Sequence, residues 1–501
     1  MSQLSSNGRL VRPLVVALLA MVAAGSLAPI AASAEPPAKA STSGTVLQTN
    51  LVSDLAGVAA VTDPNLVNSW GISESSGSPF WISDNNAGVS TLYQVPGAGS
   101  TPVSTVPLVV NIPTPVSSTG GAPTGTVFNT GSANGAFNIT GLNKTGQTTS
   151  APASFLFDTE DGTIIGWNPG IDPTGQFAGP GGLSNHGTIA VDNSGNNFTN
   201  PDPEQQTGAV YKGVAIATSS TPIIPGDANS TALLYASNFR AGTIEVYDAT
   251  IKKVTALPAG AFTDPGLPAD YAPFNVQVLN GKVYVTYARQ NATRHDDLAG
   301  PHRGFVDVFN LDGTPGLPRN AMRLVSRGPL DSPWGLAIAP PGFAGLSTPN
   351  NDPVLLVGNF GDGFINAFDS ATGSTVGQLK DPDGEPIQID GLWALKVGNG
   401  GAGGTLDTVY FTAGPFEESH GLFGSLTTAT AGSPEGPAEA QWVQANADVV
   451  QLDLQHLAQH ESSEASAATI RQDNQTLHAD SHAQAQAEQA FALDTVEDAA
   501  S

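Results

Sequence analysis

The sequence predicts an all-β fold, a six-bladed β-propeller followed by an acidic C-terminal tail. The first observation is composition: of 501 residues, 57 are Gly and 38 are Pro, which is typical of a turn-dense β protein. The second is a pattern of two short apolar strands and a third that opens with glycine. Its clearest copy, Asp331–Gly373, has expected strands at Trp334–Ala339, Val354–Gly358 and Gly363–Asp369. The third observation is that this pattern occurs six times, and sheets repeated about an axis form a propeller.

The other five copies follow the same order of three strands. Their expected strands are Ser69–Ser73, Phe80–Asp84 and Gly88–Val95; Pro123–Asn129, Ser154–Asp158 and Gly162–Trp167; Tyr211–Ala217, Leu233–Phe239 and Gly242–Asp248; Phe274–Leu279, Lys282–Tyr287 and Gly304–Asn310; and Asp390–Val397, Thr408–Ala413 and Gly421–Leu426. The distance between copies leaves room for a fourth, outer strand in each blade. One insertion, Asn168–Thr207, is expected to be a long surface loop. A second insertion, Gln290–Arg303, is charged and contains His295 and His302.

A short isolated strand is expected at Asn50–Leu55, before the first copy. Closing the ring removes open sheet edges, so we expect this strand to pair with Gly421–Leu426 in the last blade. The expected organisation is a signal peptide at residues 1–34, a flexible segment at 35–49, the propeller at 50–430 and the acidic tail at 431–501.

The first residues predict export to the periplasm or the outside of the cell. Arg9 and Arg12 precede an apolar run, Leu14–Ala24, that is too short to span a bilayer. Ala32-Ser33-Ala34 fits a cleavage site, so the mature chain is expected to begin at Glu35. No later run is apolar enough to predict a transmembrane segment.

The charge narrows the possible partners. The net charge of -26 would repel a phosphate backbone, so we expect no nucleic-acid partner. A cationic ligand or a metal ion is better matched to this surface. The chain has no cysteine, which excludes disulfides, thiolate nucleophiles and cysteine-bound metals.

Strand order predicts where a site would lie. In a propeller the first strand of each blade lines the channel, and the turn between the second and third strands lies on the face where the first strand begins. The expected inner-strand residues at that face are Trp70, Thr124, Lys212, Asn275, Trp334 and Asp390. The expected turn residues are Asp84, Asn85, Glu160, Asp161, Asn238, Arg240, Asn359, Asp362, Glu417, Glu418 and His420.

Candidate roles follow from residue chemistry. Calcium requires several oxygen ligands, and the candidates for it are Asp390, Asn275, Asp362 and Asp84. The candidates for acid–base catalysis are His420, Glu417 and Asp390. The candidates for ligand binding are Trp70, Trp334, Asn275, Asp390 and Arg240. Asn and Asp also cap turns and strand ends, and tryptophans also pack between blades, so a structural role is open for each residue.

Several segments resemble an uncharacterised family of exported bacterial six-bladed β-propeller proteins. They are NLVSDL, NSWGIS, FWISDNNAGVSTLY, SPWGLAIAP, LLVGNFGDGFINAFD and GLFGSL, and the resemblance covers about Asn50 to Leu426. More distantly the chain is similar to NHL-repeat proteins and to gluconolactonase-like calcium enzymes. The latter likeness implies a ring of Glu, Asn and Asp at the channel, whereas Lys212 and two tryptophans stand at such positions here.

The C-terminal segment has a different composition. From Ala438 to Ser501 there is neither Gly nor Pro, which favours a helical or partly disordered acidic tail. Two histidine pairs with i, i+4 spacing, His456 with His460 and His478 with His482, could bind zinc or copper on a helix. A polar tail without a metal is the simpler interpretation.

Two functions stay open at this stage. One is a binding or interaction module for an unknown small-molecule, glycan or protein ligand. The alternative is a calcium-dependent hydrolase, similar to a lactonase or esterase, that acts at the central channel. A binding module tolerates tryptophan and lysine at the channel, whereas a calcium enzyme needs oxygen ligands there.

Overall fold

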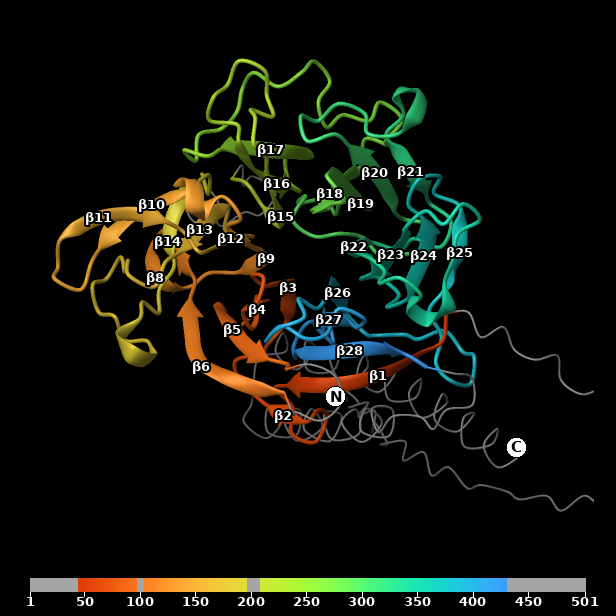
Figure 1. The fold of residues 1–501 in the computed structure, drawn as a ribbon, viewed down its shortest axis with the longest axis horizontal. Helices are drawn as coiled ribbons and strands as arrows, with labels where there is room; N and C mark the ends of the chain where they lie inside the picture. The colour runs from red at the N-terminus through yellow and green to blue at the C-terminus, as the bar shows by residue number, and fades with distance from the viewer. Residues whose placement is uncertain (1–43, 97–102, 196–207, 430–501) are drawn as a thin grey trace, which may run out of the picture. The chain divides into compact units, whose positions relative to one another are not determined.

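The described part of the chain is a ring of six sheets whose successive strands are antiparallel, the six-bladed β-propeller that the sequence predicts (Figure 1). The structure is a computed structural model and describes residues 44–96, 103–195 and 208–429. These residues all belong to one compact unit, Ser41–Ser501. The expected signal peptide and residues 431–501 of the tail lie outside the described residues. The helices within the described ranges are short 3-10 turns, and none could cross a membrane.

Each blade begins with its innermost strand and continues outward (Figure 1). The blades are, in order, β3 (Ser69–Ser73), β4 (Phe80–Asp84), β5 (Val89–Gln94) and β6 (Ser104–Asn111); β9 (Pro123–Phe128), β12 (Phe155–Thr159), β13 (Thr163–Trp167) and β14 (Thr188–Asp192); β15 (Tyr211–Thr218), β16 (Ala232–Asn238) and β17 (Thr243–Asp248); β18 (Tyr271–Leu279), β19 (Lys282–Arg289), β20 (Phe305–Phe309) and β21 (Arg323–Ser326); β22 (Pro333–Ile338), β23 (Val354–Asn359), β24 (Ile365–Asp369) and β25 (Thr375–Gln378); and β26 (Leu392–Val397), β27 (Val409–Ala413) and β28 (Leu422–Thr428).

The prediction of three strands in each blade is confirmed. The described residues also form two extra ribbons: β7 (Pro113–Thr114) with β8 (Ser117–Gly120), in the connection between blades 1 and 2, and β10 (Asn138–Leu142) with β11 (Thr148–Pro152), within blade 2. The prediction of a long loop at Asn168–Thr207 is wrong in part, because β14 lies within it and pairs with β13. This strand is short and its flanks are rich in Gly and Asn, so its pattern resembles a loop. The other insertion, Gln290–Arg303, carries no strand in the structure described here.

The ring is closed by the N-terminal strand, as predicted. Strand β1 (Val46–Ser53) pairs antiparallel with β28, from Val46 opposite Thr428 to Ser53 opposite Leu422. It also pairs in parallel with β2 (Val61–Thr62), so the sixth sheet has five strands. The strand begins four residues before the predicted Asn50 and therefore includes the end of the segment that was expected to be flexible.

Every inner strand carries a register irregularity at the same point of its pairing with the second strand. Side chains of the second strand accept hydrogen bonds from the freed amides: Asp158 Oδ1 from Gly125 N at 2.7 Å, and Thr286 Oγ1 from Asn275 N at 3.0 Å. The bulge brings adjacent inner strands close together. A Cβ added at Gly71 would lie 2.5 Å from the Thr124 carbonyl oxygen of the next blade. This close approach explains why glycine occupies the position.

On each inner strand, one residue lies directly after the last regular pair with the second strand, at the start of the bulge. This residue occupies an equivalent place in all six blades. We call these residues the channel ring; they are Trp70, Thr124, Lys212, Phe274, Trp334 and Trp393. Four of the predicted inner-strand positions are correct. Asn275 and Asp390 are wrong as ring positions, because Phe274 and Trp393 occupy them. A bulge adds a residue to one strand, so a sequence pattern can misplace it by one or more positions.

Candidate functional site

The aromatic members of the channel ring pack against one another across the ring. The rings of Trp70 and Trp393 stack with centroids 3.5 Å apart, and the Trp70 and Trp334 centroids are 6.2 Å apart. Phe274 lies 5.9 Å from Trp393. All four side chains are buried. These contacts show that the tryptophans pack against one another. Because four of the six ring positions are aromatic residues without side-chain oxygen atoms, the ring offers few oxygen ligands. The donor set of the ring therefore does not fit a calcium ion, which needs six to eight oxygen ligands.

Lys212 is the charged member of the channel ring, and its side chain is 3% exposed. Its Nζ donates a hydrogen bond to Glu160 Oε1 and lies 3.6 Å from Asp296 Oδ1. It also lies 5.0 Å from the centre of the Trp70 ring, a cation–π distance. Burial lowers the pKa of Lys212, but the charges of Glu160 and Asp296 outweigh burial and raise it. The lysine is therefore a buried ammonium held by carboxylates.

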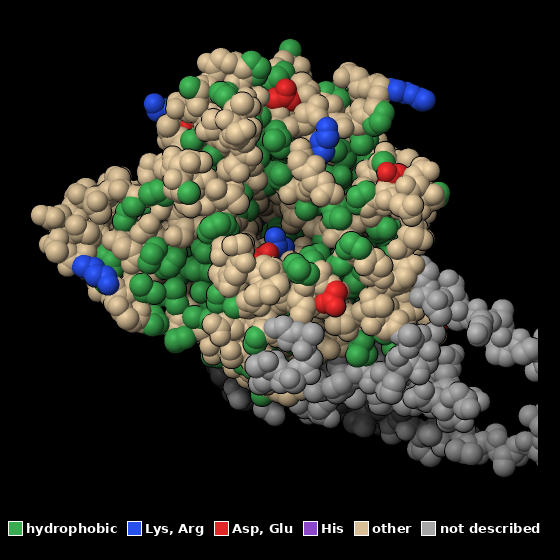
Figure 2. Space-filling view, in the orientation of Figure 1, with side chains coloured by type: hydrophobic (Ala, Val, Ile, Leu, Met, Phe, Trp, Pro, Cys, Tyr) green, Lys and Arg blue, Asp and Glu red, His purple; other side chains and the backbone are tan. Residues whose placement is uncertain are grey.

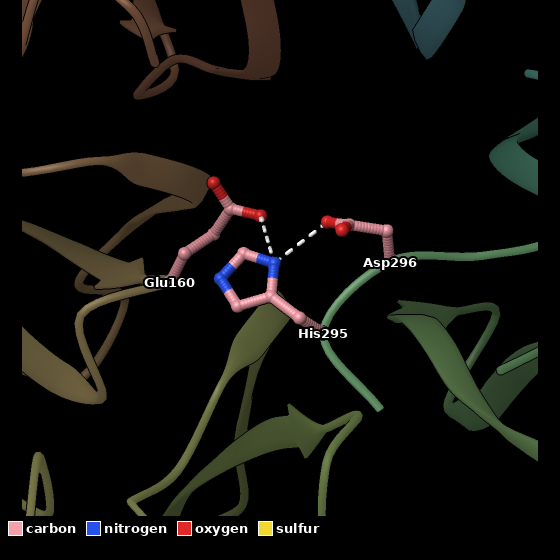
Figure 3. Close-up of side chains that lie close together, drawn as sticks. All are labelled: Glu160, His295 and Asp296. Carbon is pink, nitrogen blue, oxygen red and sulfur yellow. Dashed lines mark hydrogen bonds and ion pairs between the residues drawn. The ribbon is translucent and has the colours of Figure 1, made fainter. Parts of the chain in front are cut away.

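Three side chains lie close together (Figure 3), and two of them, Glu160 and Asp296, are the partners of this ammonium. Glu160 comes from the turn between β12 and β13, and His295 and Asp296 come from the loop after β19. His295 Nδ1 lies 2.6 Å from Asp296 Oδ1 and 4.0 Å from Glu160 Oε1. Among the described residues these three form a group whose possible ligand atoms all lie within 4.8 Å of one another. Burial raises the pKa of Asp296, but His295 and Lys212 outweigh it and hold that pKa well below its ordinary value.

Glu418 reaches the same region from blade 6 on a strained loop. The loop follows β27, and Phe416, Glu417 and Glu418 have φ angles of 56°, 52° and 67°. Three successive non-glycine residues in this region are unfavourable. Two asparagines of blade 1 hold the loop: Asn68 Nδ2 donates to Glu418 Oε2 at 2.7 Å, and Asn86 Nδ2 donates to the Glu418 carbonyl at 2.6 Å. The side chain is thus positioned at a cost in backbone strain.

We call Glu160, Lys212, His295, Asp296 and Glu418 the channel-mouth cluster. Its members come from blades 2, 3, 4 and 6. The middle of the ring is hollowed on the face that Figure 2 shows, and an acidic and a basic side chain lie together in that hollow. Glu160, Lys212 and Glu418 were among the residues that strand order predicts at this face. His295 and Asp296 were missed as site residues. The signal that could have found them is a charged loop with two histidines between the second and third strands of a blade, where the turn lies on the predicted face.

The other predicted ligand-binding residues make structural contacts. Trp334 Nε1 donates to the Lys212 carbonyl at 2.8 Å, and Asn275 Nδ2 donates to the Trp334 carbonyl at 2.7 Å, so each ties two blades together. Arg240 is buried and its Nη1 donates to the Gly208 carbonyl at 3.1 Å. Their predicted roles in binding stay predictions.

The predicted metal and catalytic residues are engaged in hydrogen bonds: Asp84 Oδ2 accepts from Thr91 N at 3.0 Å, Asp362 Oδ1 from Phe364 N at 3.1 Å, and Asp390 Oδ2 from Phe416 N, in the loop after β27, at 2.8 Å. Asp390 and Glu417 lie near each other, since burial raises the pKa of Asp390 and the charge of Glu417 raises it further. His420 Nδ1 lies 2.7 Å from Asp54 Oδ2, next to the closing strand β1, and Glu417 is exposed. These contacts explain the residues as parts of turns and of the ring closure, and their roles in a site stay predictions.

The unfolding free energy is expected to depend on pH through the raised pKa of Glu418. Burial, reinforced by the charge of Glu160 and opposed by Lys212, raises its pKa from 4.5 to about 7. A carboxyl whose pKa is raised by folding stabilises the folded state while it is protonated, and this contribution is lost as the pH rises from about 4.5 to about 7. The Glu418→Gln variant stays neutral, so at pH 8 it should exceed the wild type in unfolding free energy by up to roughly 3 kcal/mol.

Urea denaturation of both proteins at pH 5 and pH 8 measures this difference. Other buried carboxyls titrate in the same range, but they are common to both proteins and cancel in the comparison. The charged groups that act on Glu418 are Glu160, Lys212 and Asp297. A Glu418→Gln protein with the same advantage at both pH values would contradict the assignment.

Comparisons with known proteins identify relatives but no activity. No protein-family profile matches the chain. An uncharacterised protein of Acanthamoeba polyphaga mimivirus is 31% identical over 387 residues, covering 75% of this chain and 78% of the viral one. A second uncharacterised protein of that virus is 30% identical over 382 residues, covering 75% and 84%. These relatives are viral, so the bacterial source and the NHL-repeat likeness stay predictions.

Solved structures resemble this chain in fold alone. A glucose dehydrogenase gives a TM-score of 0.39 at 10% identity, covering 76% of this chain and 99% of its own. The PQQ-bound aldose sugar dehydrogenase of Streptomyces coelicolor gives 0.39 at 11%, covering 77% and 99%. The α-L-arabinanase of Penicillium chrysogenum, in complex with arabinobiose, gives 0.40 at 12%, covering 77% and 98%.

Proposed function

Since this chain belongs to the same protein family as the two mimivirus proteins, which are described only as uncharacterised, we propose a function from its channel mouth. The protein is an exported binding module, and its ligand is a small, neutral, hydroxyl-rich molecule. The observation that carries the proposal is the channel-mouth cluster, in which carboxylates from different blades hold one buried ammonium. The proposal of export is supported by the N-terminal segment, in which two arginines precede an apolar run and an Ala-Ser-Ala cleavage site.

The cluster is accessible and rich in hydrogen-bonding groups. The side chain of Asp296 is 59% exposed and that of His295 is 35% exposed, whereas Lys212 lies beneath them at 3%. Carboxylates accept hydrogen bonds from hydroxyl groups, and the histidine can donate or accept one. A few convergent polar groups of this kind fix the orientation of a small ligand.

The charge of the cluster and a nearby aromatic side chain limit the kinds of ligand that would bind. The surplus of carboxylates repels anions, and Lys212 already neutralises the innermost pair, which leaves little attraction for a second cation. Phe360, in the turn after β23, is partly exposed and stacks on Trp393 with centroids 4.0 Å apart. A partly exposed aromatic face stacked on the channel ring suits a molecule with both C–H and O–H surfaces.

Thermal-shift measurements with a panel of neutral sugars and polyols, sugar acids and organic amines test the proposal. A neutral hydroxylated compound is expected to raise the melting temperature. The Asp296→Asn variant should weaken that binding about tenfold or more, because one charge-assisted hydrogen bond is lost. Asp407→Asn is the matched control, since Asp407 is an exposed carboxylate in the turn between β26 and β27, at the opposite end of the inner strand. No shift with any neutral compound, or equal loss in both variants, would refute the proposal.

The alternative is a metal-dependent hydrolase of the lactonase or esterase kind. The observation that favours it is the group of Glu160, His295 and Asp296, whose ligand atoms lie within 4.8 Å of one another. A metal held there would polarise a carbonyl or activate water, and Glu418 is a candidate proton donor beside it. Turnover of lactones or esters that requires added Ca²⁺ or Mn²⁺ and is lost with a chelator would support this alternative over the binding module.

A further inference from the structure

The ammonium of Lys212 and a metal ion would use the same oxygen atoms. Glu160 Oε1 accepts the hydrogen bond of Lys212 Nζ, and Asp296 Oδ1 lies 3.6 Å from that nitrogen. The same two oxygen atoms lie 4.0 Å and 2.6 Å from His295 Nδ1, and Glu160, His295 and Asp296 form the group that could hold a metal ion. The lysine therefore competes with a metal ion for two of the three residues of the group.

We infer that Lys212 is a tethered cation that takes the place of a divalent metal ion, and that its removal opens a metal site formed by Glu160, His295 and Asp296. The wild-type channel mouth is then a site that needs no metal. Its carboxylates are neutralised and oriented by a residue of blade 3, whereas they themselves come from blades 2 and 4.

Three features favour the tethered ammonium over a free ion in the wild type. Lys212 is held at a high effective concentration by its own backbone on β15. Its ammonium lies over the face of Trp70, a contact that a free ion would gain only by displacing the lysine. A divalent ion beside the remaining ammonium would also meet strong repulsion, because screening by water is weak at a buried group.

The ligand set points to a first-row divalent ion rather than calcium. Two carboxylates with one imidazole suit Mn²⁺ or Zn²⁺, whereas Ca²⁺ prefers six to eight oxygen ligands. Metal binding would also stop His295 from donating its Nδ1 proton to Asp296, because the nitrogen must be free of a proton to bind.

The experiment replaces the ammonium with an apolar group of similar length. The Lys212→Met variant is expected to melt several degrees below the wild type, and millimolar Mn²⁺ is expected to restore about half or more of that loss by binding the folded state. The wild-type melting temperature should not move with Mn²⁺. Electron paramagnetic resonance of Mn²⁺ should show bound ion in the variant beyond that in the wild type.

The Lys212→Met/Asp296→Asn double variant is the control for the site, and it should lose the rescue. Histidines of the C-terminal segment are present in all three proteins, so metal bound there cancels. If Lys212→Met does not fold alone, refolding it with and without Mn²⁺ gives the same comparison. Mn²⁺ that stabilises the wild type through Asp296, or that fails to rescue Lys212→Met, would overturn the inference.

Discussion

A chain that begins at Asp54 is expected to lose the cooperative fold of the ring, because it lacks β1. Strand β1 supplies the outer pairing of the sixth blade through β28, and Val46 and Val52 are fully buried. Burial of these two side chains and the lost interstrand hydrogen bonds together amount to roughly 5–10 kcal/mol. That is comparable with the whole stability of a typical domain.

The matched control is a chain that begins at Gly44 and keeps β1. Circular dichroism and calorimetry should show a cooperative transition for the chain from Gly44, and for the chain from Asp54 either no transition or one more than about 10 °C lower. Ser53 Oγ also donates to the Gly421 carbonyl at 2.9 Å and Asp54 Oδ1 accepts from Gly421 N at 2.9 Å, so the closure involves side chains as well as the ladder. Equal transitions in the two chains would contradict the closure.

The Trp393→Ala variant is expected to lose about 3–5 kcal/mol of unfolding free energy, the usual cost of truncating a buried aromatic side chain. Trp393 is 1% exposed and stacks on Trp70 and on Phe360 with centroids 3.5 Å and 4.0 Å apart. Its removal leaves a cavity among inner strands of several blades. The surrounding inner strands cannot close this cavity without shifting, because the interior is closely packed.

Trp393→Phe is the conservative comparison. It keeps an aromatic ring and loses the hydrogen bond from Nε1 to Asn68 Oδ1 at 3.0 Å, so its loss should be about 1–2 kcal/mol. Urea denaturation of the three proteins measures both values. Equal effects of Ala and Phe would show that the hydrogen bond, and not the packing of the rings, governs stability at the channel.

The two viral relatives provide a further test of the role of the channel-mouth cluster. The family assignment rests on two viral proteins that cover about three quarters of this chain. If the channel-mouth cluster serves the same purpose in them, the carboxylates and the lysine should be found together in their structures. Their presence or absence does not depend on knowing the ligand.

The repetition of short strands was readable from the sequence because side-chain periodicity and glycine turns are local properties. Phe80–Asp84 and Ser69–Ser73 have the predicted bounds in the structure. The closing strand was also predictable, since an early unpaired strand must find an edge in a closed ring. The same antiparallel order correctly predicted that Glu160, Lys212 and Glu418 meet at one face.

Only the tertiary structure decided which side chains come into contact at that end of the channel. Bulges placed Phe274 and Trp393 on the channel ring in place of Asn275 and Asp390, because one extra residue in a strand changes its register. The path of a loop without periodicity brought His295 and Asp296 to Lys212. Register irregularities and loop paths depend on contacts between blades distant in sequence, and no local pattern encodes those contacts.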